Sequence, residues 1–250
     1  MSDKYQEFTD RLIQSFTNNM SHIPEEWTIS ERLSEKITMD GELKPFYGST
    51  SVIALSEQDG AKCRAIQNEL FARHADMFVK LHPETFHLTI HAFSNPYSVS
   101  NDNDEIKRDM EANEGSIKAE FRKIGEVYKG RTIRMKALGV STGGGDVISI
   151  KFCPAADQDY QIIGDLFDRF ERLYPLNKPY IPHVSLGYFK LKKYDSSEIK
   201  SLYDTLNYLN QGAGFEIELE VNRFAYQHHY HMNDFRDVFR VDSVEDQQKD

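Results

Sequence analysis

The sequence predicts an α+β protein with a two-lobed, pseudo-symmetric fold, in which each lobe is an antiparallel-rich sheet with helices outside and an active-site cleft lies between the lobes. Strand-like and helix-like hydrophobic patterns alternate along the chain. A strand–helix–strand unit also occurs twice, and each copy ends in a strand that carries a histidine. The interval Val52–His87 in the first copy equals the interval Ile148–His183 in the second.

The first 45 residues precede these units and are polar. We predict three parts of the chain: a helical or irregular extension over residues 1–45, a single two-lobed domain over residues 46–242, and a flexible tail over residues 243–250. Apolar residues recur at helical spacing within the extension, at Tyr5, Phe8, Leu12 and Phe16.

The first repeated unit follows the extension. Its pattern predicts a strand over residues 49–56, a helix over 57–81 and a strand over 85–93. Pro83 ends the helix because proline cannot continue one. The apolar face of this helix consists of Ile66, Leu70, Met77 and Leu81. A charged segment at 98–128 then predicts a surface helix, which begins at the capping residues 101–104.

The second half of the chain repeats the order of strands and helices. Its elements are predicted as strands over 132–140 and 146–152, a helix over 158–173, a strand over 183–190, a helix over 196–209 and a strand over 215–226. Gly143–Gly145 predicts a hairpin turn between the first two of these strands. Residues 237–241 are expected to pair with the last one.

Composition and charge narrow the function classes. Apolar residues make up 39% of the 250 residues, with 16 Phe and 13 Tyr, so the chain can build a sizeable core. The net charge of −10 disfavours long nucleic acids, which are usually bound by a basic surface. A small nucleotide or an RNA end needs only a local basic pocket, and this is the partner we expect.

The chain shows no sign of a secreted or membrane protein. Cys63 and Cys153 form no CxxC motif and are expected to be free thiols in a reducing compartment. The N-terminus lacks an apolar signal core, and no run approaches the roughly 18 apolar residues of a membrane span. We therefore predict a cytoplasmic protein without a membrane partner, and leave its oligomeric state open.

Two strands share one pattern of histidine, apolar residue, hydroxyl and apolar residue. They contain His87-Leu88-Thr89-Ile90 and His183-Val184-Ser185-Leu186. Alternate side chains of a strand lie on the same face, so each histidine is expected beside a hydroxyl. The pattern therefore places an imidazole next to a hydroxyl twice, once in each unit. For either motif alone, a structural histidine with a hydroxyl neighbour is an equally good interpretation; the pair favours a catalytic one.

These motifs resemble those of the 2H phosphoesterase superfamily, which includes RNA 2′,3′-cyclic phosphodiesterases and proteins called 2′-5′ RNA ligases. The segment Tyr180–Gly187 is the sharper match, and the resemblance spans residues 47–241. It implies a phosphoric diester hydrolase with catalytic His87, Thr89, His183 and Ser185. Positions where ligase-like members often carry arginine hold Ile181 and Tyr188 here, so RNA ligation is the weaker alternative.

The chemistry of histidine supports the same reaction. Opening a cyclic phosphodiester needs one base to activate water and one acid to protonate the leaving oxygen, and imidazole suits both near neutral pH. Thr89 and Ser185 are expected to donate hydrogen bonds to the phosphate oxygens. The scheme requires no metal and no other cofactor. It does not say which histidine is the acid.

Four aromatic or imidazole side chains near the motifs are candidate substrate-binding residues: Tyr180, Tyr188, Phe93 and His91. The ordinary alternative for each is packing within the sheet or a loop. Lys151 and Lys190 lie on or beside strands of the second lobe and could add positive charge there.

Two other function classes stay open. One is a non-catalytic nucleotide- or RNA-binding protein on the same fold, although a pure binder has no need of two acid–base groups. The other is a metalloprotein that uses the cluster His228–His231. This cluster lacks an accompanying cysteine or a carboxylate at metal-ligand spacing, so we interpret it as an exposed loop.

Overall fold

The computed structural model describes residues 3–27, 29–143, 145–212 and 214–244. Its strands form two antiparallel sheets with the orders β3-β1-β8-β9 and β2-β6-β5-β4-β7. The four-stranded sheet consists of β1 (Gly48–Ala54), β3 (His87–Ala92), β8 (Phe224–His231) and β9 (Asp234–Arg240). The five-stranded sheet consists of β2 (Phe78–Lys80), β4 (Thr132–Ser141), β5 (Val147–Pro154), β6 (His183–Phe189) and β7 (Glu216–Glu220).

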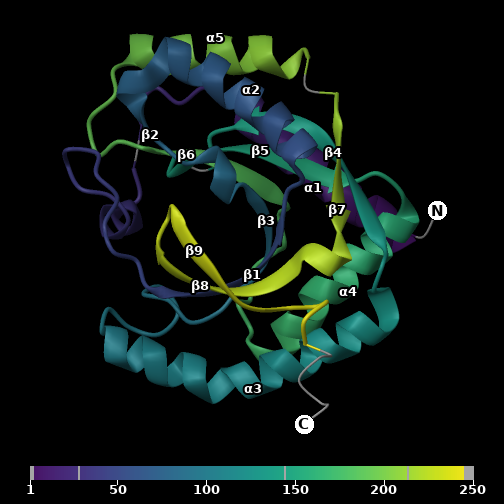
Figure 1. The fold of residues 1–250 in the computed structure, drawn as a ribbon. Helices are drawn as coiled ribbons and strands as arrows, with labels where there is room; N and C mark the ends of the chain where they lie inside the picture. The colour runs from purple at the N-terminus through teal and green to yellow at the C-terminus, as the bar shows by residue number, and fades with distance from the viewer. Residues whose placement is uncertain (1–2, 28, 144, 213, 245–250) are drawn as a thin grey trace.

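Helices cover the outer faces of these sheets (Figure 1). The α-helices are α1 (Asp3–Ser21), α2 (Glu57–His74), α3 (Asn103–Tyr128), α4 (Asp157–Leu173) and α5 (Ser196–Asn210). α2 and α5 lie against the five-stranded sheet, and α3 and α4 lie below the four-stranded one. The α+β class with two antiparallel sheets and outer helices is therefore confirmed. No helix within the described ranges is long and apolar enough to span a bilayer.

The repeated unit is visible in the pairing of the strands. β1 pairs with β3 in one sheet, and β5 pairs with β6 in the other. The helices between them cross over: α2 packs against β2 and β6 of the other unit's sheet, whereas α4 packs against β3 as well as β4 and β5. This exchange brings β3 against β6, so the two histidine-bearing strands are neighbours in space.

The predicted helix over residues 57–81 is wrong at its C-terminal end. α2 ends at His74, and Phe78–Lys80 instead form the edge strand β2, which pairs with β6. Phe78 and Val79 are buried there. Aromatic and β-branched residues favour a strand, and the free edge of β6 supplies the hydrogen bonds. Helical spacing of the apolar residues continued past His74 and concealed the change.

The predicted strand over residues 215–226 is two strands in different sheets. β7 pairs with β4, a turn at Val221–Arg223 follows, and β8 pairs with β1. Apolar residues recur at alternate positions from Phe215 to Val221 and again at Phe224 and Tyr226, so the sequence pattern did not reveal the change of sheet. The expected pairing of residues 237–241 with this segment is confirmed by β8 and β9.

The hairpin predicted around Gly143–Gly145 corresponds to the antiparallel pair β4 and β5, and Gly144 itself lies outside the described residues. The predicted tail over residues 243–250 lies mostly outside them too, from residue 245 onward. Val244, at the last described position, is only 1% exposed.

The N-terminal extension packs onto the five-stranded sheet. α1 lies against β4 and β5, with Tyr5 and Leu12 buried. The chain then passes the end of β6, where Trp27 packs on Phe189 with ring centroids 4.6 Å apart. The Ser30 amide donates a hydrogen bond to the Asp146 carboxylate over 3.0 Å. These contacts direct the next segment, which includes Lys36, toward the space between the sheets.

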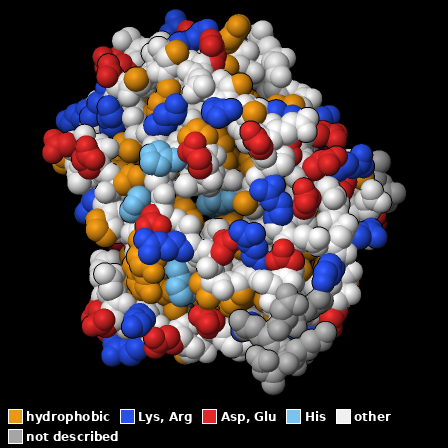
Figure 2. All heavy atoms as spheres, viewed as in Figure 1, with side chains coloured by type: hydrophobic (Ala, Val, Ile, Leu, Met, Phe, Trp, Pro, Cys, Tyr) orange, Lys and Arg blue, Asp and Glu red, His pale blue; other side chains and the backbone are white. Residues whose placement is uncertain are grey.

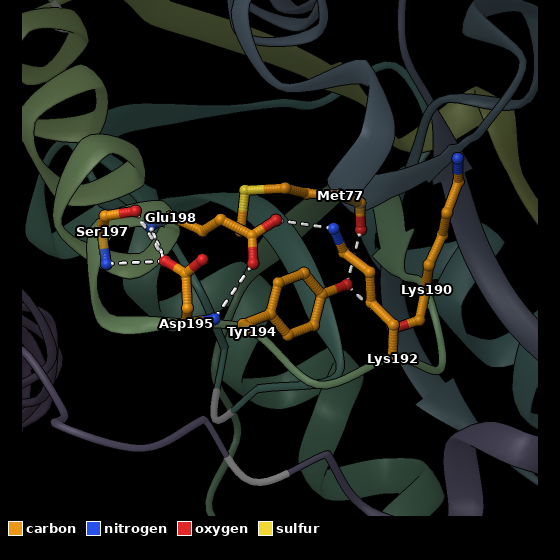
Figure 3. Close-up of polar contacts among 7 residues, drawn as sticks. All are labelled: Met77, Lys190, Lys192, Tyr194, Asp195, Ser197 and Glu198. Atoms are coloured by element: carbon orange, nitrogen blue, oxygen red, sulfur yellow. Dashed lines mark hydrogen bonds and ion pairs between the residues drawn. The ribbon is translucent and has the colours of Figure 1, made fainter.

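A network of polar contacts holds the end of β6 to the start of α5 (Figure 3). Asp195 accepts hydrogen bonds from the Ser197 and Glu198 amides, and Glu198 accepts one from the Asp195 amide over 3.0 Å, which forms a capping box. The Tyr194 hydroxyl lies 2.9 Å from the Met77 carbonyl oxygen, which precedes β2. The edge strand β2 is thereby held in register beside β6.

Candidate active site

A cavity of about 220 Å³, called here the histidine cavity, is lined by residues of both sheets and brings the two motifs together. β3 contributes His87 and Thr89, and β6 contributes His183 and Ser185. The residue between the members of each pair is fully buried, as period-two alternation requires. Figure 2 shows histidine side chains in the middle of one face of the molecule, with acidic and basic side chains around them.

Both motif histidines are held by the same local hydrogen bond. Nδ1 of His87 lies 2.7 Å from the Thr85 carbonyl oxygen, and Nδ1 of His183 lies 2.8 Å from the Ile181 carbonyl oxygen. A carbonyl only accepts, so Nδ1 carries the proton in each neutral ring. Each Nε2 therefore holds a lone pair and has no partner in the part of the chain that the structure describes. Both rings therefore present the same atom, Nε2, as a proton acceptor at the cavity.

Burial favours the neutral form of both rings. It lowers the pKa of His87 to about 4, against the favourable bond to the Thr85 carbonyl. For His183, burial and then the positive charge of Lys151 lower the pKa to about 3. Bound phosphate would oppose these effects, because a neighbouring negative charge favours the imidazolium.

The hydroxyls beside the histidines are available to a ligand. Thr89 and Ser185 line the cavity, and neither side chain has a hydrogen bond within residues 3–27, 29–143, 145–212 and 214–244. Each hydroxyl can donate one hydrogen bond. The site thus pairs one proton acceptor with one neutral donor on each of two facing strands.

Lys36 supplies positive charge to the same cavity and was not expected from the sequence. Its ammonium lies 5.0, 5.2 and 5.1 Å from the ring centroids of Phe46, Tyr97 and Tyr188. Cation–π attraction to three faces fixes the group in place. Burial lowers the pKa of Lys36 to about 8, and Asp146 opposes this shift. Its ammonium makes no hydrogen bond or ion pair within the described ranges, so its three donors are open to a ligand.

A third histidine lines the cavity from β8. Nδ1 of His229 lies 2.8 Å from the Phe46 carbonyl oxygen, and its ring stacks on the Phe46 ring. Burial lowers the pKa of His229 to about 4. On β9, Phe235 packs edge-on against His87, with ring centroids 4.8 Å apart. Both His229 and Phe235 line the histidine cavity, and the Phe235 ring packs against one side of His87.

The structure does not bring His91 and Phe93, two of the candidate substrate-binding residues, to the histidine cavity. Ser51 of β1 pairs with His91 and the next residue pairs with Thr89, so Ile90 is an extra residue in β3. This bulge turns His91 away from the cavity, and Nε2 of His91 lies 3.1 Å from the Glu171 carboxylate on α4. Phe93 is fully buried among other aromatic rings. Neither side chain lines the histidine cavity.

The two tyrosines around the second motif have different positions. Tyr188 lines the cavity and contacts Lys36, as a substrate-binding residue would. Tyr180 does not line it: its hydroxyl donates a hydrogen bond to the Thr89 carbonyl over 3.1 Å, and its ring stacks on Phe167. Tyr180 therefore connects the second motif to the strand of the first, and its expected contact with substrate is not supported.

The cluster His228–His231 lies in β8, so its interpretation as an exposed loop is wrong. Alternation along the strand separates its members: His229 faces the histidine cavity, whereas His228 lies 3.9 Å from the Glu114 carboxylate of α3. In the described ranges, no group of three or more His, Cys, Asp or Glu side chains is arranged to hold a metal ion.

Two residues of the histidine cavity, Lys36 and His229, were not among the predicted site residues. Lys36 lies in the extension that precedes the repeated units, and its place depends on how that segment crosses the sheets. Continuing the alternation of residues 215–226 through the histidine cluster would have predicted a strand and made His229 a candidate. Lys151, which the sequence suggested as a possible source of positive charge, lies opposite His183 across the β5–β6 ladder.

Comparisons with known proteins support the fold. No protein-family model and no curated protein matches the chain. Among solved structures, a conserved protein of unknown function from Agrobacterium tumefaciens matches 85% of this chain and 100% of its own, with a TM-score of 0.64 and 14% identity. This likeness shows a shared fold.

Two weaker matches are a phosphoesterase (TM-score 0.42, 11% identity, 78% of this chain and 94% of that one) and E. coli LigT in its apo form (0.43, 11%, 79% and 97%). The class that the fold and the site define is therefore an α+β protein of two antiparallel sheets, with paired His-hydroxyl motifs facing one cavity.

Proposed function

We propose that the protein is a metal-independent phosphodiesterase that hydrolyses a cyclic phosphate, a cyclic nucleotide or the phosphodiester at an oligonucleotide end. One observation carries the proposal. His87 and His183 each bond a backbone carbonyl through Nδ1 and leave Nε2 free at one small cavity. Two equivalent imidazoles from facing strands are what an acid–base pair on opposite sides of a phosphorus atom needs.

The reaction is a single in-line displacement. One imidazole accepts a proton from water through Nε2 while the water oxygen forms a bond to phosphorus. The second imidazole, protonated when the phosphate is bound, donates its Nε2 proton to the leaving oxygen as the old phosphorus–oxygen bond breaks. One imidazole gains a proton and the other loses one, so the total charge of the pair is unchanged after the reaction. The protonated and neutral rings have exchanged places, and proton exchange with water restores the starting state.

Three groups are suited to the charge on the non-bridging oxygens. Thr89 and Ser185 offer hydroxyl donors beside the two imidazoles, and Lys36 offers a fixed ammonium. Donors that are already oriented cost no reorganisation as negative charge develops. They also place local positive charge in a protein whose net charge is −10. With both proton transfers and the charge stabilisation supplied by side chains, the mechanism has no step that calls for a metal ion.

The deciding experiment measures hydrolysis of a substrate panel in excess EDTA. The panel contains 2′,3′-cyclic nucleotides, 3′,5′-cyclic nucleotides and short 2′-5′ and 3′-5′ oligonucleotides. His183→Ala is assayed beside the wild type, and His82→Ala at an exposed position is the matched control. Turnover of one substrate class by the wild type and the control, absent in His183→Ala, is the expected result.

Other outcomes count against the proposal in different ways. Activity that disappears with chelator and returns with zinc would refute the metal-free mechanism. Tight binding of a panel member without turnover would favour a nucleotide-binding protein instead. Full activity of His183→Ala would remove the assigned acid–base pair.

A further inference from the structure

A second and larger cavity lies beside the histidine cavity. It has a volume of about 730 Å³ and is called here the α1 cavity, because α1 and the segment that follows it form one wall. The opposite wall comes from β4, the turn after it, and β5. Phe16 and Trp27 contribute aromatic surface, and Asn18 and Thr142 contribute polar groups. The cavity has no part in the proton transfers described above.

Lys151 lies in the α1 cavity and close enough to His183 of the histidine cavity for its charge to act on that imidazole. Its side chain lines the α1 cavity, and its backbone pairs with that of His183 across the β5–β6 ladder. Directly opposed residues of an antiparallel pair extend from the same face of the sheet, so Lys151 and His183 share one face. The Lys151 ammonium has no hydrogen bond or ion pair in the part of the chain that is described. An ammonium group that is unpaired in this way and lies next to His183 is suited to an anionic ligand group.

The volumes of the two cavities indicate which part of a ligand each could hold. Small-molecule sites usually occupy ~300–1,000 Å³. The histidine cavity, at about 220 Å³, is below this range and suits a phosphate with part of a sugar. The α1 cavity, at about 730 Å³, lies within it. A phosphate held between the two imidazoles would therefore leave the rest of a nucleotide outside the histidine cavity, next to Lys151.

We propose that the α1 cavity binds the nucleoside portion of the substrate, with its ring against Trp27 and Phe16, while Lys151 contacts the phosphate oxygens next to His183. The inference rests on the proposed function and narrows its substrate class to phosphodiesters that carry a nucleoside. Flat aromatic surface and side-chain amides are the groups that bind unpaired nucleobases. Glu26 is the carboxylate among the residues that line this cavity. Its side chain is exposed to solvent, so it does not neutralise the charge of Lys151.

The N-terminal extension supplies one wall of this site. α1 and Trp27 precede residue 47, where the motif resemblance to other phosphoesterases begins. Their hydrogen bonds fix the wall: the Asn19 side chain donates to the Thr142 hydroxyl over 3.2 Å, and the Trp27 indole donates to the Gly145 carbonyl over 3.4 Å. The helix and the turn are thus joined across the cavity, which gives residues 1–45 a role in substrate selection.

The test uses Trp27, the one tryptophan of the chain, as a built-in probe. Tryptophan fluorescence of the full-length protein is titrated with 3′-AMP and, separately, with inorganic phosphate. Inhibition of phosphodiester turnover by each ligand is measured in parallel and reports on the histidine cavity. We expect 3′-AMP to change the fluorescence saturably, and phosphate to inhibit turnover without changing it.

Two variants examine the contacts directly. Lys151→Met should raise the dissociation constant of 3′-AMP roughly tenfold or more, the size of a lost charge-assisted contact. Lys136→Met, on the exposed side of β4, is the matched control and should leave it unchanged. Ser15→Phe fills the cavity from an exposed position of α1 and should abolish the fluorescence change while phosphate still inhibits. This variant keeps the test decisive if Lys151→Met does not fold.

The outcomes separate this inference from the proposed function. If 3′-AMP inhibits turnover of wild type and Ser15→Phe equally, and fluorescence stays constant, the nucleoside site is wrong and the hydrolase stands. If 3′-AMP changes the fluorescence but no panel member is hydrolysed, the nucleoside site is supported and the hydrolase proposal fails.

Discussion

Lys151 lies directly opposite His183 across the β5–β6 ladder, and after burial its charge is the largest cause that lowers the pKa of the His183 imidazole. The lowered pKa of His87 comes from burial, without a neighbouring cation among its causes. The two motifs are therefore alike in hydrogen bonding but differ in electrostatics. We therefore expect a bound phosphate, which raises both pKa values, to favour protonation of His87 over His183.

This asymmetry predicts His87 as the acid and His183 as the base in the first proton transfers. His87→Ala should lower kcat by roughly 10²–10⁴-fold on a substrate with a poor leaving group. With a p-nitrophenyl phosphodiester, whose leaving oxygen needs no proton, much of that loss should disappear for His87→Ala and persist for His183→Ala. Kinetics on both substrates check this, with circular dichroism to show that each variant is folded. Recovery in His183→Ala instead would reverse the assignment.

The alkaline side of the pH–rate profile is expected to report on Lys36. Its ammonium has a pKa lowered to about 8, so the positive charge at the cavity is lost as the pH rises through that value. kcat/KM should fall there, because the free enzyme binds phosphate less well. Lys36→Arg keeps its charge at all relevant pH values, so its profile should extend further into the alkaline range. An unchanged alkaline limb in Lys36→Arg would point to another group, such as Lys151.

The tyrosines of the second motif should separate stability from substrate binding. Tyr180→Phe leaves the Thr89 carbonyl without its hydrogen bond, so we expect the free energy of unfolding to fall by about 1 kcal/mol and kcat to decrease with little change in KM. Tyr188→Phe keeps the ring beside Lys36 and removes a hydroxyl at the cavity, so KM should rise at unchanged stability. Urea unfolding and steady-state kinetics of both variants make the comparison. The same effect in both would show that neither position has the role described.

The two His-hydroxyl pairs could be predicted because each depends only on neighbouring residues in one strand. An imidazole and a hydroxyl two residues apart on a strand share a face whatever the rest of the fold does. The same rule failed at His91, where the extra residue Ile90 reverses the faces of β3. A bulge depends on the partner strand, here β1, and the alternating sequence of β3 contains no sign of it.

The rest of the cavity depends on long-range structure. Lys36 reaches it only because Trp27 and Ser30 attach the extension across the five-stranded sheet. His229 lines the cavity because the chain passes from one sheet to the other at the turn Val221–Arg223. The spacing of apolar residues does not predict this change of sheet. Both depend on which elements become neighbours, and hydrophobic patterning describes one element at a time.

His229 also makes the stability of the fold depend on pH. It is buried and neutral, and its folded pKa of about 4 lies below the ordinary value of 6.5. As the pH falls, the unfolded chain takes up a proton first, so the contribution to stability is complete above about pH 6.5 and is lost toward pH 4. Each pH unit in that window should cost about 1.4 kcal/mol per such histidine.

A non-titrating replacement at this position tests the assignment. His229→Asn retains an N–H that can donate to the Phe46 carbonyl but cannot be protonated in this range. Between pH 6.5 and pH 5, the wild type should lose about 2 kcal/mol more unfolding free energy than His229→Asn, as measured by urea denaturation. His82→Asn, at an exposed position, should follow the wild type. If the wild type and His229→Asn showed the same pH dependence, the acid sensitivity would arise from other histidines. His87 and His183, which line the same cavity, would then be the next to test.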